Sequence, residues 1–227
     1  MSPRSTLLLR LVIFKTFAVY LIERMIIVNT KNYLEEKELK SLIKKIEKTN
    51  KNVIVAVPAI YLKEISKNTK LNIYAQHLDP VLYETTTGAV IPKMIKKMNV
   101  KGSLINHSEY QLLLGEIKII VEQCKKYDLK SIVCASDLRE VKQIIKFNPT
   151  AIAFEDPKLI SSGKSITKHN PKMIKKFVKL LEKTNIVPLC GAGISTKEDI
   201  KAAEDLGCKG VLIASAVAKK GKVEILK

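Results

Sequence analysis

The stretch Thr150-Ala-Ile-Ala-Phe-Glu-Asp-Pro-Lys-Leu-Ile-Ser-Ser-Gly-Lys164 decides the fold. Its apolar run, residues 151–154, has a proline on either side, which favours a short buried strand over a helix. The run ends at Glu155, so the carboxylate lies at the C-terminal end of the strand, where α/β folds hold their chemistry. The small residues 161–163 are typical of a mobile lid. Taken alone, the stretch also fits an exposed glutamate before an ordinary loop.

Strand and helix patterns alternate from Met25 onward. We expect strands at 26–28, 53–57, 71–75, 103–105, 131–134, 151–154, 186–189 and 210–213, and helices at 34–48, 60–66, 89–98, 112–127, 137–146, 171–183 and 195–206. Two helix starts carry capping pairs, Asp137 with Glu140 and Ser195 with Glu198. The strands lack polar alternation, which indicates a parallel sheet covered on its outside.

Eight strand–helix units favour a closed (β/α)8 barrel, a parallel sheet ringed by helices and active at the C-terminal ends of its strands. An open, doubly wound sheet is the alternative, but no G-x-G-x-x-G follows the first strand. Only residues 218–227 follow Val217, so we expect a short last helix and a thinly covered flank there.

The length of 227 residues suits one barrel, and an apolar fraction of 46% supplies its core. The four cysteines form no C-x-x-C pair, which fits a reducing compartment and predicts a cytoplasmic protein. The three histidines lack metal-ligand spacing. We therefore expect no metal.

The net charge of +18 comes mostly from lysines at helical spacing, which are typical of solvated helix faces. Nucleic-acid binders more often cluster arginine and interleave aromatic residues, so we expect no nucleic-acid partner. A catalytically quiet basic barrel that binds nucleic acid is the alternative. A positive field also helps an anionic substrate to approach.

Residues 1–24 differ in composition from the rest of the chain. They hold three of its four arginines, whereas lysine dominates residues 25–227. Their apolar part is interrupted by charge and too short to span a bilayer. We expect residues 25–227 to be a single barrel domain, and residues 1–24 to be an extension from a wrong start, with Met25 the true start. An amphipathic segment that touches a membrane or partner is the alternative; we expect no membrane partner.

Polar residues and glycines follow most of the predicted strands. They are Asn29-Thr30-Lys31, Gln76-His77, Asn106-His107-Ser108-Glu109, Glu155, Cys190-Gly-Ala-Gly193 and Ala214-Ser215. In a closed barrel they meet at one rim, and amide-rich loops after the last two strands are the usual phosphate site. No cofactor motif appears, so we expect chemistry by side chains alone. A base, an imidazole and a cation suit proton abstraction beside a carbonyl, through an enediolate shielded from water.

In this order the motifs resemble the triose-phosphate isomerase family in its shorter archaeal form, over residues 25 to about 220. The motifs that carry the resemblance are Asn29-Thr30-Lys31, Asn106 to Glu109, Glu155-Asp156-Pro157 with Leu159-Ile160, Cys190 to Ser195, and the segment around Ala214. The resemblance implies a TIM barrel that interconverts dihydroxyacetone phosphate and D-glyceraldehyde 3-phosphate, in glycolysis and gluconeogenesis.

By this resemblance, Glu155 takes the proton and a neutral His107 polarises the carbonyl. A helix N-terminus after His107 would favour the neutral ring. Lys31 would stabilise the enediolate and pair with Glu109. Substrate binding falls to Asn29, Thr30, Lys31, Ile160, Gly193, Ala214 and Ser215. The resemblance also implies a homo-oligomer, a tetramer in the archaeal form, whose partners are small triose phosphates.

The chain departs from the family pattern in four places. Asp156 stands where proline is usual, Ser161-Ser162-Gly163 where Gly-Thr-Gly is usual, and Tyr110-Gln111 where a basic residue is usual. The fourth departure is the short C-terminal segment. We expect these four departures to affect the catalytic rate and the stability of the protein more than the class of reaction. A sugar-phosphate epimerase or synthase is the alternative enzyme, but it gives no reason for Lys31, His107 and Glu155 together.

Overall fold

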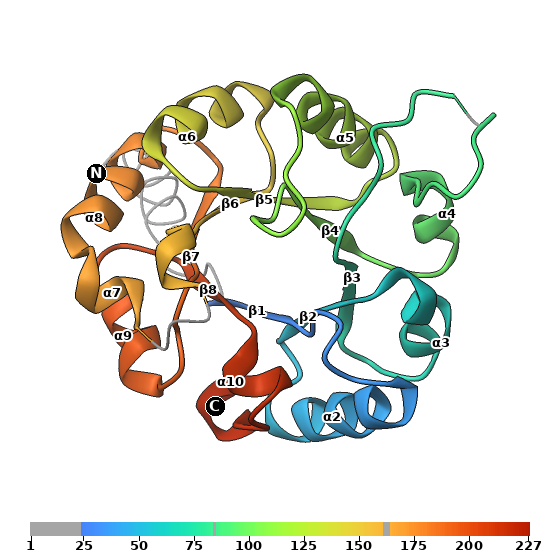
Figure 1. The fold of residues 1–227 in the computed structure, drawn as a ribbon, viewed down its shortest axis with the longest axis horizontal. Coiled ribbons are helices and arrows are strands. Elements are labelled where there is room, and N and C mark those ends of the chain that lie inside the picture. The colour runs from blue at the N-terminus through green and yellow to red at the C-terminus, as the bar shows by residue number, and fades with distance from the viewer. Residues whose placement is uncertain (1–23, 84, 161–163) are drawn as a thin grey trace, which may run out of the picture.

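The computed structural model describes residues 24–83, 85–160 and 164–227. These residues form eight parallel strands that close into a barrel surrounded by helices (Figure 1). The strands are β1 (Met25–Asn29), β2 (Ile54–Val57), β3 (Asn72–Ala75), β4 (Gly102–Ile105), β5 (Lys130–Ala135), β6 (Ala151–Phe154), β7 (Val187–Cys190) and β8 (Gly210–Ile213). Each strand pairs with the next along the chain, and β8 pairs with β1. The predicted (β/α)8 barrel is confirmed, and the open doubly wound sheet is wrong.

The helices follow the predicted order but several are shorter. They are α2 (Glu36–Thr49), α3 (Leu62–Lys67), α4 (Pro92–Lys97), α5 (Leu114–Lys126), α6 (Leu138–Ile144), α7 (Ile166–His169), α8 (Pro171–Leu181), α9 (Lys197–Asp205) and α10 (Ser215–Ala218), with 3₁₀ turns η1 (Ala59–Tyr61), η2 (Ile145–Phe147), η3 (Pro157–Leu159) and η4 (Val223–Leu226). The helix predicted to start at 89 begins at Pro92, whose fixed φ suits a first helical position. A short helix that was not predicted, α7, precedes α8.

The cap of α9 corrects a prediction. Thr196 is the N-cap, and its side chain accepts a hydrogen bond from the backbone N–H of Asp199 at 3.1 Å. The Asp199 carboxylate accepts in turn from the backbone N–H groups of Thr196 and Ser195. The predicted pair of Ser195 with Glu198 is therefore wrong by one residue. Both pairs satisfy the sequence pattern, but only Asp199 is buried against these donors, while Glu198 is exposed.

The strands bury side chains on both faces. Ile27 and Leu104 lie in the cluster inside the barrel, whereas Ile26 and Val28 belong to the layer between the sheet and the helices. Burying one such side chain stabilises the fold by roughly 1.5–3 kcal/mol. The rim that carries the polar residues therefore rests on a packed scaffold.

The C-terminal segment covers the flank that the sequence predicts to be thin. The helix α10 has four residues, and η4 follows it and packs against α2, as Figure 1 shows at the bottom of the ring. Ile225 and Leu226 are buried there, and the Asn50 side chain donates a hydrogen bond to the Leu226 carbonyl at 2.7 Å. The last helix is short, as predicted, but the tail takes over part of its role.

The predictions for residues 1–24 fall outside the described residues, except at Arg24. Its guanidinium lies 3.4 Å from the Glu204 carboxylate and donates to the Lys227 carbonyl at 3.3 Å. Within the described ranges, no helix combines the length and the apolar character needed to cross a membrane.

Candidate active site

A cavity lies at the C-terminal ends of the strands. Of the residues predicted for the site, it is lined by Asn29, Lys31, His107, Glu155, Ile160, Gly193, Ala214 and Ser215. They come from the ends of β1, β4 and β6, from the segment after η3, and from the loops after β7 and β8. The barrel thus brings together residues far apart in the sequence, as a closed parallel sheet must.

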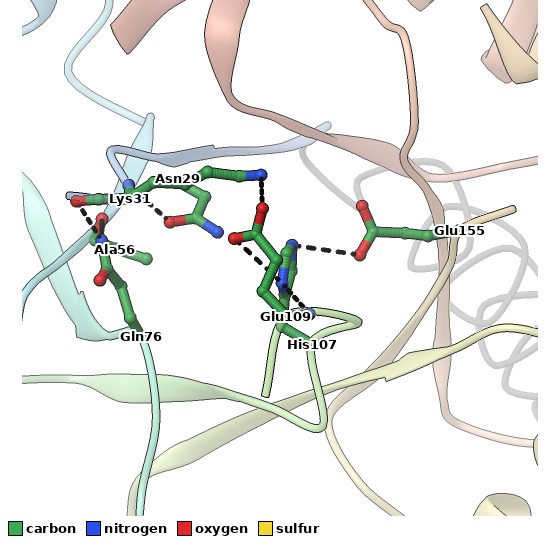
Figure 2. A network of polar contacts seen from close by, with 7 residues as sticks. All are labelled: Asn29, Lys31, Ala56, Gln76, His107, Glu109 and Glu155. Atoms are coloured by element: carbon green, nitrogen blue, oxygen red, sulfur yellow. Dashed lines mark hydrogen bonds and ion pairs between the residues drawn. The ribbon is translucent and has the colours of Figure 1, made fainter. Parts of the chain in front are cut away.

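Hydrogen bonds of its backbone groups hold Lys31 in place. Its backbone conformation is left-handed, with φ of +47°. Its N–H donates to the Asn29 side chain at 2.9 Å, and its carbonyl accepts from the Gln76 side chain at 3.0 Å. Figure 2 shows the resulting direction of the side chain, whose ammonium reaches the Glu109 carboxylate at 2.6 Å. The predicted pairing of Lys31 with Glu109 is therefore present, and it fixes a cation at the cavity.

Thr30 does not line the cavity. Its side chain is buried, and its hydroxyl donates to the Ala56 carbonyl at 3.0 Å and lies 3.2 Å from the Gln76 amide nitrogen. Its side chain is not part of the cavity wall, and that Thr30 binds substrate stays a prediction. The residue instead ties the loop after β1 to the neighbouring strand.

The imidazole of His107 points into the cavity from the end of β4. Its Nδ1 accepts a hydrogen bond from the Glu109 backbone N–H at 3.2 Å. In a neutral ring this bond places the proton on Nε2, which faces Glu155. The expected helix N-terminus is not adjacent, because a turn closed by Tyr110 follows His107 and α5 begins only at Leu114. The donor that faces the ring is therefore the backbone N–H of Glu109 in that turn, instead of a helix N-terminus.

Glu155 is buried at the end of β6, as the sequence predicts. Its Oε2 lies 3.7 Å from Nε2 of His107 and has no hydrogen-bond partner among the described residues. Burial raises the pKa of the Glu155 carboxyl above its ordinary value. A positive charge on the His107 ring, present only when that ring is protonated, and the hydrogen bond of the Cys134 thiol lower that pKa without cancelling the effect of burial.

Two glycines after β7 make room in the site. A Cβ on Gly191 would lie 2.5 Å from Oε1 of Glu155, so only hydrogen leaves space for the carboxylate. Gly193 has φ of +74°, and a Cβ there would collide with the Lys164 carbonyl. Both positions therefore require glycine for reasons of space, and Gly193 also for its backbone.

Some residues of the cavity wall were not predicted. Tyr33, Lys220 and Lys222 line it in addition to the expected residues. Both lysines belong to the segment after α10, whose bend is not evident from local sequence patterns. Their charge makes the cavity more cationic than Lys31 alone.

The departures from the family pattern lie in different places. Asp156 does not line the cavity: its carboxylate accepts from the Lys158 backbone N–H at 3.0 Å and caps η3. It lines a separate pocket with Arg139 and Met173. The predicted lid residues Ser161-Ser162-Gly163 lie outside the described residues.

Comparison with known proteins adds to this geometry. A family model described as triosephosphate isomerase matches residues 24–226. The chain is 37% identical over 208 residues to a triosephosphate isomerase of Methanocaldococcus jannaschii, covering 88% of this chain and 95% of that protein. It is 40% identical to one of Sulfurisphaera tokodaii, covering 80% and 81%, and 38% identical to one of Methanobrevibacter smithii, covering 86% and 91%. The chain therefore belongs to the triosephosphate isomerase family.

Proposed function

We propose that the chain interconverts dihydroxyacetone phosphate and D-glyceraldehyde 3-phosphate by proton transfer through an enediolate. The observation that carries this proposal is the grouping of Lys31, His107 and Glu155 around one cavity. Membership of the family supports the same reaction.

In the proposed reaction Glu155 takes a proton from C1 of dihydroxyacetone phosphate. The electrons of the broken C–H bond form a C1–C2 double bond, and the carbonyl oxygen on C2 becomes negative. The Nε2–H of His107 and the ammonium of Lys31 stabilise that oxygen. The proton of the C1 hydroxyl then passes to the oxygen on C2. Return of the proton from Glu155 to C2, with the C1–C2 double-bond electrons forming the new C–H bond and a carbonyl re-forming at C1, yields the aldehyde. The raised pKa of Glu155 favours it as a base that can also give the proton back.

The other end of the cavity suits the phosphate. Backbone amides near Gly193, Ala214 and Ser215 are proposed to hold it, with Ile160 beside the predicted lid. Asn29 lines the cavity while its side-chain oxygen accepts from the Lys31 backbone N–H, so its NH₂ group is proposed to orient the substrate.

The test is isomerase activity of the purified chain in both directions, measured by coupled oxidation or reduction of the product. Glu155→Gln is expected to abolish turnover and to keep the far-UV circular dichroism spectrum. Full activity of that variant would contradict the assignment of the base. Turnover of a pentose phosphate but not of triose phosphates would favour the epimerase alternative.

We also propose a cytoplasmic role in glycolysis and gluconeogenesis. The four cysteines are buried and unbridged, which suits a reducing compartment. Detection of the enzyme in the soluble fraction of its cells, separate from membranes, is the expected result.

A homo-oligomer, a tetramer by family resemblance, is proposed from the apolar surface around the rim. Ile60, Leu82, Tyr83 and Leu113 are between 58% and 80% exposed, and they follow β2, β3 and β4. In Figure 1 the segment between β3 and α4 extends away from the barrel at the upper right. Light scattering coupled to gel filtration is expected to give four times the mass of one chain; a monomer would contradict the proposal.

A further inference from the structure

Glu140 does not cap its own helix. It is the third residue of α6, where a glutamate often bonds back to the N-cap backbone. In this structure Asp137 alone caps the helix, accepting from the N–H groups of Arg139 at 2.7 Å and Glu140 at 2.9 Å. The predicted capping pair is therefore only half present, and the Glu140 carboxylate is available for other partners.

The Glu140 carboxylate accepts three hydrogen bonds from two different loops. Its Oε1 accepts from the Asn106 amide at 2.7 Å. Its Oε2 accepts from the backbone N–H of Ser136 at 2.7 Å and from the Ser136 hydroxyl at 3.0 Å. Because all three partners donate, an ionised carboxylate matches them and a neutral amide cannot.

Asn106 is the residue directly before His107, and its conformation is unusual. It is buried, with a left-handed backbone at φ of +59°. Its amide also donates to the Cys134 carbonyl at 3.0 Å, and its oxygen accepts from the Leu112 backbone N–H at 2.8 Å. Asn106 therefore joins both ends of the loop that carries His107 to β5, and Glu140 holds it there.

The same network lies behind the base. Asn106, Cys134, Glu140 and Glu155 line one small cavity at the back of the site. Glu140 is not among the residues that line the main cavity. It can act on the reaction only through its neighbours.

We propose that Glu140, acting through Asn106, is a positioning residue that sets the direction of the His107 ring. This inference rests on the proposed isomerase function. A misplaced ring would still let substrate bind but would align Nε2 poorly with the carbonyl oxygen, so kcat should fall while KM changes little.

The test is a cycle of Glu140→Gln, Asn106→Asp and the double variant. In Glu140→Gln one amide oxygen must serve donors on two sides, so the new NH₂ group opposes either the Asn106 amide or the Ser136 backbone N–H. In Asn106→Asp two carboxylates oppose each other. In the double variant the new amide at position 140 can donate to the new carboxylate at position 106. The bond is then restored in the reverse direction, and the net charge equals that of the unchanged chain.

We expect kcat to fall by roughly tenfold in Glu140→Gln, and by more in Asn106→Asp, because both changes misalign the ring. The double variant should regain several-fold over Asn106→Asp. A double variant that folds but is no better than Asn106→Asp would overturn the inference.

Glu38→Gln is the matched control, because Glu38 holds the same third position in α2 and accepts from the Glu35 backbone N–H, and neither residue lines the cavity. It removes one charge, and the amide oxygen can still accept from the Glu35 backbone N–H, so kcat should stay as in the unchanged chain. Equal kcat in Glu140→Gln and Glu38→Gln would also overturn the inference.

A second readout separates this inference from the proposed function. The ¹⁵N resonances of the His107 ring, assigned by comparison with His107→Gln, report the hydrogen bond at Nδ1. They should shift in Glu140→Gln and stay unchanged in Glu38→Gln, even if the chain had no isomerase activity. Unchanged His107 resonances in Glu140→Gln would overturn the inference independently of any activity.

Discussion

Oε2 of Glu155 lies 3.7 Å from Nε2 of His107, in a site where both side chains are less than 10% exposed. The carboxylate is thus largely shielded from water, and its Oε2 lacks a hydrogen bond within the described part of the chain. Such a group lowers stability when ionised, because the lost hydration is not replaced.

The first prediction follows from this burial. Since the folded pKa of Glu155 is raised, the folded state holds the proton more tightly than the unfolded state. The penalty is therefore absent well below the ordinary pKa and appears as pH rises through the folded pKa. Glu155→Gln removes it, so its Tm should exceed that of the unchanged chain at pH 7 to 8. The gain should be roughly 2–4 °C per kcal/mol of penalty removed.

Thermal unfolding at several pH values checks the sign. The gain should shrink as the pH falls toward the ordinary pKa of a glutamate, about 4. Glu182→Gln, at an exposed site, is the control and should show no such pH-dependent gain. A loss of stability in Glu155→Gln at neutral pH would contradict the expectation.

Lys31 and Lys220 both line the cavity, but only Lys31 is fixed. The Lys31 side chain is 8% exposed and bonded to Glu109, whereas Lys220 is exposed. Lys31→Met should therefore lower kcat/KM by roughly 10²–10³-fold, the usual effect of losing one preorganised donor. Lys220→Met should mainly raise KM, by less, and with stronger dependence on salt. Steady-state kinetics on both variants measure these effects. Equal losses of kcat/KM in the two variants would show that only the total charge of the cavity matters.

Gly191 offers a prediction about space. A Cβ there meets the end of the flexible Glu155 side chain, so Gly191→Ala should displace the carboxylate without unfolding the barrel. We expect kcat to fall by roughly 10²-fold, as for other small misplacements of a reacting group. Gly115→Ala is the control, since nothing lies within 4 Å of its Cβ and the residue is in α5. It should keep full activity and gain roughly 0.5–1 kcal/mol of stability.

Much of the barrel could be predicted from sequence because its strands are short apolar runs between turn residues. The run at 151–154 ends at Glu155, and the closed sheet then fixes where that carboxylate points. The positions of Lys31 and His107 followed from the same rule. Chain order therefore predicted which segments meet at the rim, while the pairing of Lys31 with Glu109 was implied by the family resemblance.

The rest depended on contacts that no local pattern contains. Thr30 shares a motif with two cavity residues, yet its side chain bonds a neighbouring strand. Glu140 fits a capping pair, but Asn106 of another loop takes its carboxylate. Lys222 reaches the cavity only because the tail bends after α10. Each outcome was decided by tertiary packing, which overrides local preference.

The last prediction concerns the tail, which closes the ring of helices against α2. Leu226 is fully buried, and its carbonyl accepts from the Asn50 side chain at 2.7 Å. Leu226→Ala should therefore lower the free energy of unfolding by roughly 2–5 kcal/mol, because it removes buried contacts and leaves a cavity. Glu224→Ala, exposed in the same 3₁₀ turn, should change it by less than about 0.5 kcal/mol. Urea unfolding followed by circular dichroism measures both variants. A Leu226→Ala protein as stable as the Glu224→Ala protein would show that packing of the tail against α2 contributes little to the stability of the barrel.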